Sequence, residues 1–229
     1  MDYNIKPLDM LYLFTKEELQ GFCEQYQIKS RGNIRLNIIE NYRDIKNLYL
    51  ENYDLIARRD LNGLAERGIS IKEAEIGVKF EELTKEIWQK LGFNVDEKLR
   101  KKLNSKRGLM DILLNIGDNE VIIVECKTQK DKDFNKYTSV TRQLQSYEKL
   151  CTENSLKVNQ VILVAPEFSE EFINECEYEP ELSFSLITSA GLYSILEAYK
   201  TSKRQDFPTK LLYKGGMLDS SRIASVIAK

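Results

Sequence analysis

Apolar residues recur at helical spacing through about the first 65 residues of the chain. A first helix is predicted to begin near Thr15, because Thr-Lys-Glu-Glu is a capping box there, and a second helix is predicted beyond a polar turn at residues 29–33. The apolar positions that mark the two helices are Leu19, Phe22, Cys23 and Tyr26, then Ile34, Ile38, Ile39 and Tyr42. We therefore predict a small all-helical domain over residues 1–68, with a linker near residues 62–68.

From about residue 72 the pattern alternates between helical spacing and short β-rich runs. A helix over 73–91 should end at Gly92, and two strands should form a hairpin around the turn Gly117-Asp118-Asn119. The predicted strands are 93–95, 109–116, 121–125, 160–165 and 184–187, and the further helices are 140–150, 190–199 and a short one after Asp219. This order predicts an α/β domain over residues 69–229, with a mixed β-sheet flanked by helices.

The amino-acid composition limits which catalytic groups and which binding partners are possible. The 229 residues are 42% apolar, which is enough for a sizeable core, and 34 basic against 36 acidic residues leave a net charge of −2. A nucleic-acid partner would therefore have to meet a local basic patch. The chain contains no histidine, which excludes imidazole bases and Cys/His zinc sites. Carboxylates, lysines, hydroxyls or thiols must carry any catalysis.

The cysteines predict neither a disulfide framework nor a zinc cage. The sequence has no Cys-x-x-Cys pair, no pattern typical of a signal peptide, and no apolar run near the roughly 18 residues that a membrane helix needs. The four cysteines are Cys23, Cys126, Cys151 and Cys176. We expect a reduced, soluble, cytoplasmic protein with no membrane partner.

The most informative segment is the predicted hairpin. Residues i and i+2 of a strand share a face, so Glu125 and Lys127 point the same way, and the hairpin brings Asp111 beside them. Two carboxylates about 4 Å apart repel by roughly 4 kcal/mol at an effective dielectric constant near 20. A bound divalent cation would offset that repulsion, and an all-oxygen ligand set suits Mg²⁺.

An acid-x-Lys tripeptide alone carries little information. The chain has three of them, Asp44-Ile-Lys46, Asp96-Glu-Lys98 and Glu125-Cys-Lys127. The third follows the β-branched run Val121-Ile-Ile-Val and has an acid one hairpin upstream. The alternative is a solvated strand end with an ordinary Glu/Lys pair.

The segment from Gly108-Leu-Met-Asp111 to Glu125-Cys-Lys127 resembles the PD-(D/E)XK nuclease superfamily, with Met110 where a proline often stands. The resemblance implies a restriction-endonuclease-like fold and a Mg²⁺ site, with Mn²⁺ able to substitute. It implies that Asp111, Glu125 and the Cys126 carbonyl bind the metal. It also implies that Lys127 positions or activates the attacking water, and that hydrolysis leaves a 5′-phosphate.

Two helices resemble further parts of this family. Gly77-Val-Lys-Phe80-Glu81, followed by Leu91-Gly92-Phe93, resembles the helix that carries an additional acid, which makes Glu81 the candidate third carboxylate. Rival carboxylates are Glu75, Glu82 and Glu86, and Glu81 could instead be an ordinary solvated residue.

Gln143-Leu-Gln-Ser-Tyr147 resembles the Q-x-x-x-Y element of several restriction and recombination nucleases, in which Gln143 and Tyr147 share a helix face and serve the active site. The alternative for Tyr147 is packing with Val140 and Leu144. Weaker similarity to type IIS cleavage domains extends over 164–167, 186–189 and 216–219.

Two basic regions could contact DNA phosphates. The N-terminal helix-turn-helix segment resembles a SAP-like module, and a second patch lies just upstream of Asp111. The candidate DNA-binding residues are Lys29, Arg31 and Arg35 in the first region, and Lys101, Lys102, Lys106 and Arg107 in the second. Solvated helix faces are the alternative for both.

Together these features predict a Mg²⁺-dependent DNA endonuclease, a type II restriction enzyme or its cleavage subunit. It would act on DNA as a homodimer or with a second nuclease or recognition subunit, because one centre cuts one strand. The alternatives are a structure-selective repair or recombination nuclease and a catalytically silent DNA-binding module on the same fold.

Overall fold

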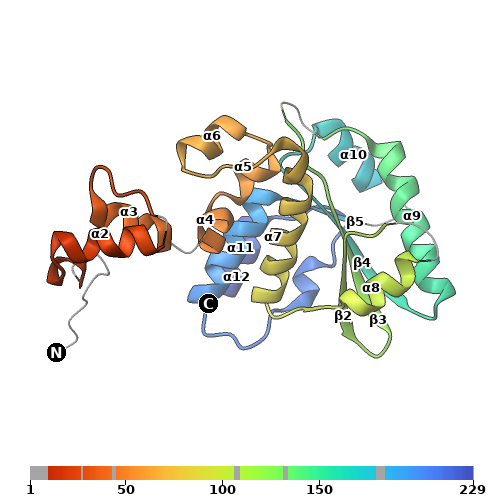
Figure 1. Ribbon diagram of the computed structural model, residues 1–229. Coiled ribbons are helices and arrows are strands. Elements are labelled where there is room, and N and C mark those ends of the chain that lie inside the picture. The colour runs from red at the N-terminus through yellow and green to blue at the C-terminus, as the bar shows by residue number, and fades with distance from the viewer. Residues whose placement is uncertain are drawn as a thin grey trace. The chain divides into compact units, whose positions relative to one another are not determined.

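In a computed structural model, the chain divides into two units, Met1–Glu51 and Asn52–Lys229. The structure describes residues 10–26, 28–42, 45–105, 109–130, 134–178 and 184–228. Helices form the described part of the first unit, and the second unit contains a β-sheet (Figure 1).

The first unit confirms the predicted N-terminal helical region. Its helices are η1 (Leu11–Leu13), α2 (Lys16–Gln25), α3 (Ile34–Tyr42) and α4 (Ile45–Glu51). The capping box forms as predicted: the Thr15 hydroxyl accepts from Glu18 N at 3.2 Å, and the Glu18 carboxylate accepts from Thr15 N at 2.7 Å. A small core holds α2 and α3 together through Leu19, Cys23, Ile28, Ile34 and Ile38.

The second unit is built on a six-stranded mixed sheet in which the spatial order of the strands follows the chain. The strands are β1 (Asn94–Val95), β2 (Ile112–Gly117), β3 (Glu120–Cys126), β4 (Lys157–Ala165), β5 (Phe184–Thr188) and β6 (Gly216–Met217). The first three strands are antiparallel, and β3 to β6 are parallel. The predicted β2–β3 hairpin closes where Gly117 (φ 120°) and Asn119 (φ 64°) adopt positive φ angles, which Gly and Asn tolerate best.

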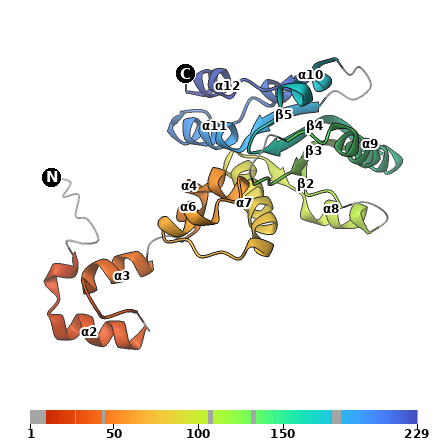
Figure 2. The ribbon, with the colours of Figure 1, turned by 90° about the horizontal axis from the view of Figure 1, so that it is seen from above.

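Helices cover both faces of this sheet (Figure 2). They are α5 (Tyr53–Ala57), α6 (Leu61–Glu66), η2 (Glu73–Glu75), α7 (Ile76–Lys90), α8 (Glu97–Asn104), α9 (Tyr137–Glu153), α10 (Glu170–Tyr178), α11 (Ser189–Thr201), η3 (Thr209–Leu212) and α12 (Ser220–Ile227). Alternate strand residues such as Leu113, Ile123 and Leu163 pack with α9 and α10. Helices α7 and α11 lie on the opposite face (Figure 2). This arrangement confirms the predicted mixed sheet flanked by helices.

The observed unit boundary differs from the predicted one at residues 68/69. The structure places α5 and α6 in the second unit, because Tyr53 stacks on Phe80 of α7 with ring centroids 4.8 Å apart, and its hydroxyl lies 2.5 Å from the Thr84 hydroxyl. Asp54 also accepts a 2.5 Å hydrogen bond from Ser189 at the start of α11. Segment 52–68 therefore helps to build the core that the sequence pattern assigns to residues 69–229.

The charged stretch after residue 96, for which the pattern predicts only a turn, begins as helix α8. Asp96 caps this helix by accepting from Leu99 N at 2.9 Å, and Leu103 is buried in the sheet core. The pattern also does not predict α10 or the two-residue strand β6. Among the described residues, no helix is long and apolar enough to span a membrane.

Candidate active site

The hairpin brings the predicted acids and lysine together at one end of the sheet. Ile112 of β2 lies opposite Val124 of β3, so Asp111 lies beside the end of β3. Its Oδ2 accepts a hydrogen bond from Cys126 N at 2.8 Å, and Lys127 N continues the sheet by donating to Val164 O at 2.8 Å. The backbone therefore fixes both sides of the site.

Glu125 is the most buried acid of the site, with 1% of its surface exposed. Its Oε1 accepts from Lys127 Nζ at 2.6 Å and from Gln143 Nε2 at 2.9 Å. Its Oε2 is buried and has no hydrogen-bond partner among the described residues. Burial, followed by the nearby Asp111 charge, raises the pKa of Glu125 to about 8. The folded chain by itself thus holds this carboxyl largely protonated at neutral pH.

Asp111 has its pKa raised as well. Burial is the main cause, and the negative charge of Glu81 on α7 raises the pKa further. The Cys126 N–H and the Lys127 and Lys85 ammonium groups act in the opposite direction. Two neighbouring carboxyls with raised pKa values show that the site resists carrying two negative charges at once.

A divalent cation would relieve both features of this carboxyl pair. It would offset the repulsion between Asp111 and Glu125 and give the unpartnered Glu125 Oε2 a ligand. No group of three or more acidic or cysteine side chains is arranged as a metal-ion cage in the described part of the chain. Two carboxylates, with water and phosphate oxygens completing the shell, are a common Mg²⁺ environment. The residues present therefore fit Mg²⁺.

Cys126 faces the other side of the strand. Burial raises the pKa of its thiol well above the ordinary value, and the thiol contacts the Thr84 hydroxyl. A neutral, buried thiol is a poor metal ligand. The prediction that Cys126 contributes its carbonyl concerns the backbone and stays a prediction.

Gln143 and Tyr147 lie one turn apart on α9 and both reach the site, as the Q-x-x-x-Y spacing predicts. The Gln143 amide accepts from Lys127 Nζ at 3.1 Å, and its Nε2 donates to Glu125 at 2.9 Å and to the Tyr147 hydroxyl at 2.5 Å. Tyr147 in turn donates to Leu109 O at 2.8 Å. Burial raises the pKa of Tyr147 to about 12, so the phenol stays protonated and holds Gln143 in place.

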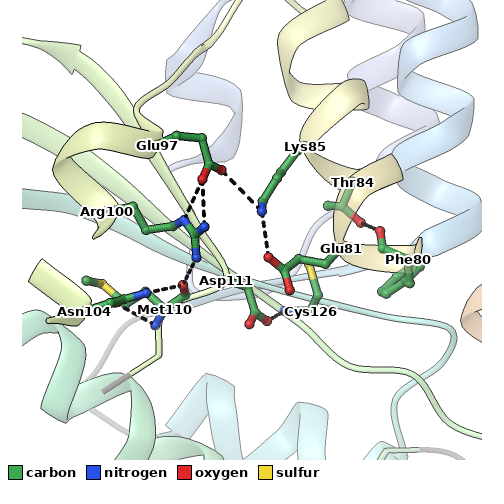
Figure 3. A network of polar contacts seen from close by, with 10 residues as sticks. All are labelled: Phe80, Glu81, Thr84, Lys85, Glu97, Arg100, Asn104, Met110, Asp111 and Cys126. Atoms are coloured by element: carbon green, nitrogen blue, oxygen red, sulfur yellow. Dashed lines mark hydrogen bonds and ion pairs between the residues drawn. The ribbon is translucent and has the colours of Figure 1, made fainter. Parts of the chain in front are cut away.

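Glu81 is the one of the four candidate helix acids that acts on the pKa of Asp111. Figure 3 shows it on the side of α7 that points toward Asp111. The three rivals Glu75, Glu82 and Glu86 form ion pairs with Lys72 (3.8 Å), Lys79 (2.8 Å) and Lys90 (3.4 Å). Glu81 also forms an ion pair, with Lys85 at 2.7 Å, so its position near Asp111 is what distinguishes it from the rivals, and its role as third carboxylate stays a prediction.

Figure 3 shows a network of polar contacts near Asp111 that joins α7 to α8. The sequence does not predict this network. Lys85 Nζ lies 2.7 Å from Glu81 and 3.2 Å from Glu97 of α8, and Glu97 pairs with Arg100 at 2.7 Å. Arg100 Nη1 and Asn104 Nδ2 each donate to the Met110 carbonyl at 3.1 Å. The i,i+4 pair Glu81/Lys85 and the i,i+3 pair Glu97/Arg100 are visible in the sequence, but their connection requires the fold.

The described residues of the basic patch upstream of Asp111 differ in exposure. Arg100 points inward to this network, whereas Lys101 and Lys102 are exposed on α8. The predicted contacts Lys106 and Arg107 lie outside the described residues.

In the first unit, Lys29 and Arg31 are exposed, as expected of DNA-contacting residues. Arg35 is engaged within the unit: its Nε donates to Leu11 O at 3.0 Å, its Nη2 donates to Phe14 O at 3.3 Å, and its guanidinium lies 4.5 Å from the centre of the Tyr12 ring. Arg35 therefore has a structural role that the sequence does not reveal.

Searches for known protein families and among curated proteins found no match to this chain. Among solved structures, the chain is similar to the small subunit of the heterodimeric restriction endonuclease R.BspD6I, with 16% sequence identity and a TM-score of 0.44. The match covers 72% of this chain and 84% of that subunit. The case for a function rests on the site itself.

Proposed function

We propose that this protein is a Mg²⁺-dependent DNA endonuclease, a type II restriction enzyme or the cleavage subunit of one. The observation that carries the proposal is the buried Glu125 carboxyl, which has an oxygen without a hydrogen-bond partner among the described residues and lies 2.6 Å from Lys127 Nζ. Its raised pKa agrees with this geometry. An ammonium and two carboxyls in one partly buried site suit hydrolysis of an anionic phosphodiester.

In this proposal Asp111 and Glu125 hold the cation, the Cys126 carbonyl is a further ligand, and Glu81 acts through water. When bound between these ligands, Mg²⁺ or Mn²⁺ would supply a positive charge able to polarise a phosphoryl oxygen and to lower the pKa of coordinated water. The hydrogen bond from Cys126 N to Asp111 supports a fixed ligand position, because it leaves that carboxylate little freedom to rotate.

Lys127 orients the attacking water and stabilises the negative charge that develops on the phosphate. Its ammonium is already held at the site by Glu125 and by Gln143 at 3.1 Å. Gln143 and Tyr147 are positioning residues, because their hydrogen bonds reach the reacting groups through Glu125 and Lys127.

DNA is the proposed partner. Exposed Lys101 and Lys102, together with Lys106 and Arg107, precede Asp111 in the chain and would bind the backbone near the scissile phosphate. Lys29 and Arg31 would give the first unit a sequence-independent affinity for DNA. Cutting both strands needs two centres or two sequential cuts, and the proposed active form is a homodimer or a complex with a second nuclease or recognition subunit.

Cleavage of supercoiled plasmid tests the proposal directly. Nicked or linear DNA should appear with Mg²⁺ or Mn²⁺ and not in EDTA, whereas Ca²⁺ should permit binding with little cleavage. Asp111→Asn should abolish cleavage, and Asp118→Asn, the same change in the exposed hairpin turn, should leave it intact.

Full cleavage in EDTA, or by Asp111→Asn, would refute the metal-dependent mechanism. A wild-type protein that binds DNA but never cuts it would instead be the silent binding module. Preference for branched or flapped DNA over plain duplex would identify a structure-selective nuclease.

A further inference from the structure

A third basic region, distinct from the two predicted from the sequence, lies just past the end of β3, the strand that carries Glu125. A pocket of about 390 Å³ is lined by residues from the α5–α6 connection and from the segment after β3. The lining residues are Arg58, Arg59, Asp60, Leu61, Asn62 and Lys130. Three of the six are cationic. Arg58 is paired with Asp54 at 2.8 Å and with Glu167 at 3.1 Å, which leaves Arg59 and Lys130 as the cations that can bind a ligand.

The pocket is tied to the chain segment that follows Lys127. Gln129 N donates to Ala57 O at 3.0 Å, and Arg59 Nη1 donates to Thr128 Oγ1 at 3.2 Å. Lys127 and Lys130 are three residues apart, so their Cα atoms are at most about 11 Å from each other. The pocket is therefore close enough to Lys127 for both to contact the same DNA strand.

Arg59 is held in a conformation that its residue type seldom adopts. Its φ of 55° lies in the left-handed region, where a non-glycine side chain is disfavoured. The side chain is 27% exposed, and Nη2 donates to Glu73 O at 3.2 Å. This conformation ends α5, because Asp60 N donates to Leu55 O at 3.0 Å and Arg59 N donates to Ile56 O at 3.0 Å, and the side chain is then held at the pocket by Thr128.

Arg59 keeps unused donors although an acid lies close to it: its Nη2 is 3.6 Å from Glu73 Oε1, an ion pair too long to be a hydrogen bond. The Asp60 carboxylate accepts from Gly63 N at 2.9 Å and so caps α6. Arg59 uses two of its five N–H groups in hydrogen bonds to described residues, those to Thr128 and Glu73. Lys130 is exposed beside it. A planar guanidinium next to an ammonium matches the geometry and charge of a phosphate group.

We infer that this pocket binds a backbone phosphate of the substrate strand, close to the scissile phosphate. The inference rests on the proposed nuclease function and adds a substrate contact to it. Holding the strand on the far side of Lys127 from α8 would align the scissile bond with Asp111 and Glu125.

The test is the affinity of the full-length protein for a short DNA duplex, measured by fluorescence anisotropy in Ca²⁺ at several salt concentrations. Arg59→Gly removes the guanidinium and suits the positive φ, so the fold should persist. Lys130→Gln changes an exposed side chain, and Arg67→Gln is the matched control, an exposed arginine outside the pocket lining.

We expect Arg59→Gly and Lys130→Gln each to weaken binding roughly tenfold and to reduce the slope of log K against log salt by about 1, with Arg67→Gln unchanged. Wild-type affinity and slope in both pocket variants would overturn the inference, and so would an equal loss in Arg67→Gln. Either result would leave the nuclease proposal standing if the wild-type protein cleaves. A wild-type protein that neither binds nor cuts DNA would overturn the nuclease proposal itself.

Discussion

Two acid-x-Lys tripeptides of the second unit carry the same pattern in opposite electrostatic settings. In Asp96-Glu-Lys98, the acid caps a helix and accepts from Leu99 N at 2.9 Å and Asn115 Nδ2 at 3.1 Å, which lowers the pKa of Asp96. In Glu125-Cys-Lys127, burial at the end of β3 raises the pKa of Glu125 to about 8. Asp96 thus has hydrogen-bond donors that stabilise its charge, whereas Glu125 Oε2 has no hydrogen-bond partner among the described residues.

The tripeptide therefore acquires its chemistry from the helix or strand that contains it. A helix N-terminus offers free amides to the acid and leaves Lys98 in solvent. At the end of β3, Glu125 is buried away from water. Lys127 lies on the same face of the strand, and its Nζ is 2.6 Å from the Glu125 carboxylate.

The largest contrast is expected between Glu125→Gln and Asp96→Asn, which make the same chemical change. Glu125→Gln removes a proposed metal ligand, and we expect cleavage to fall by about 10³ or more, beyond 4 kcal/mol of lost transition-state stabilisation. Asp96→Asn keeps a good N-cap residue and should cleave at the wild-type rate. The measurement is the initial rate of plasmid nicking in Mg²⁺. Equal cleavage rates in the two variants would contradict the claim that Glu125 is catalytic and Asp96 is not.

The two lysines provide the next contrast. Lys127→Met keeps much of the side-chain volume and loses the ammonium, so cleavage should fall by about 10², or roughly 3 kcal/mol, while metal binding survives. Lys98→Met should alter DNA affinity at most, because Lys98 is exposed on α8. Single-turnover cleavage rates at saturating protein separate the two effects. A fully active Lys127→Met beside an inactive Lys98→Met would mean that the other tripeptide is catalytic.

Stability should depend on pH through the buried acid. Glu125 has its folded pKa raised from 4.5 to about 8, so its contribution to the free energy of unfolding is fully present below pH 4.5 and is lost as the pH rises toward 8. In EDTA, the Tm of the wild-type protein should therefore fall by a few degrees over this range relative to Glu125→Gln. Mg²⁺ should raise the Tm more at pH 8 than at pH 5.5, because it binds the ionised form. A Mg²⁺ effect that is the same at both pH values would contradict this linkage.

The smallest effect is expected at the helix cap. Asp96→Ala removes the acceptor for Leu99 N and should lower the free energy of unfolding by about 1 kcal/mol. Asp118→Ala in the exposed turn should stay within about 0.5 kcal/mol of wild type. Urea unfolding measures both. A cap variant as stable as the turn variant would show that Asp96 contributes little to α8.

The elements around the site follow from local signals in the sequence. The capping box at Thr15, the Gly117-Asp118-Asn119 turn and the β-branched run before Glu125 act over a few residues, and the structure contains the element that each predicts. The i,i+4 spacing of Gln143 and Tyr147 is equally local, and it correctly places both side chains at the site.

The parts that the sequence does not predict depend on long-range packing. Tyr53 joins the second unit through Phe80 and Thr84, contacts that no spacing in the segment before residue 68 reveals. The link from Glu81 through Lys85 to Glu97 connects two helices whose relative placement only the sheet determines. Arg35 binds carbonyls more than 20 residues away in sequence, a role that no local spacing reveals, and its predicted contact with DNA stays a prediction.

The most direct test of the account is the number of protons released when Mn²⁺ binds, measured by titration calorimetry at pH 7 in buffers of different ionisation enthalpy. Because the pKa of Glu125 is raised to about 8, metal binding should release close to one proton from the wild-type protein and from Asp96→Asn. Glu125→Gln should bind Mn²⁺ weakly and release markedly less. Absence of Mn²⁺ binding, or the same affinity and proton release in Glu125→Gln as in wild type, would contradict the claim that this buried carboxyl is a metal ligand.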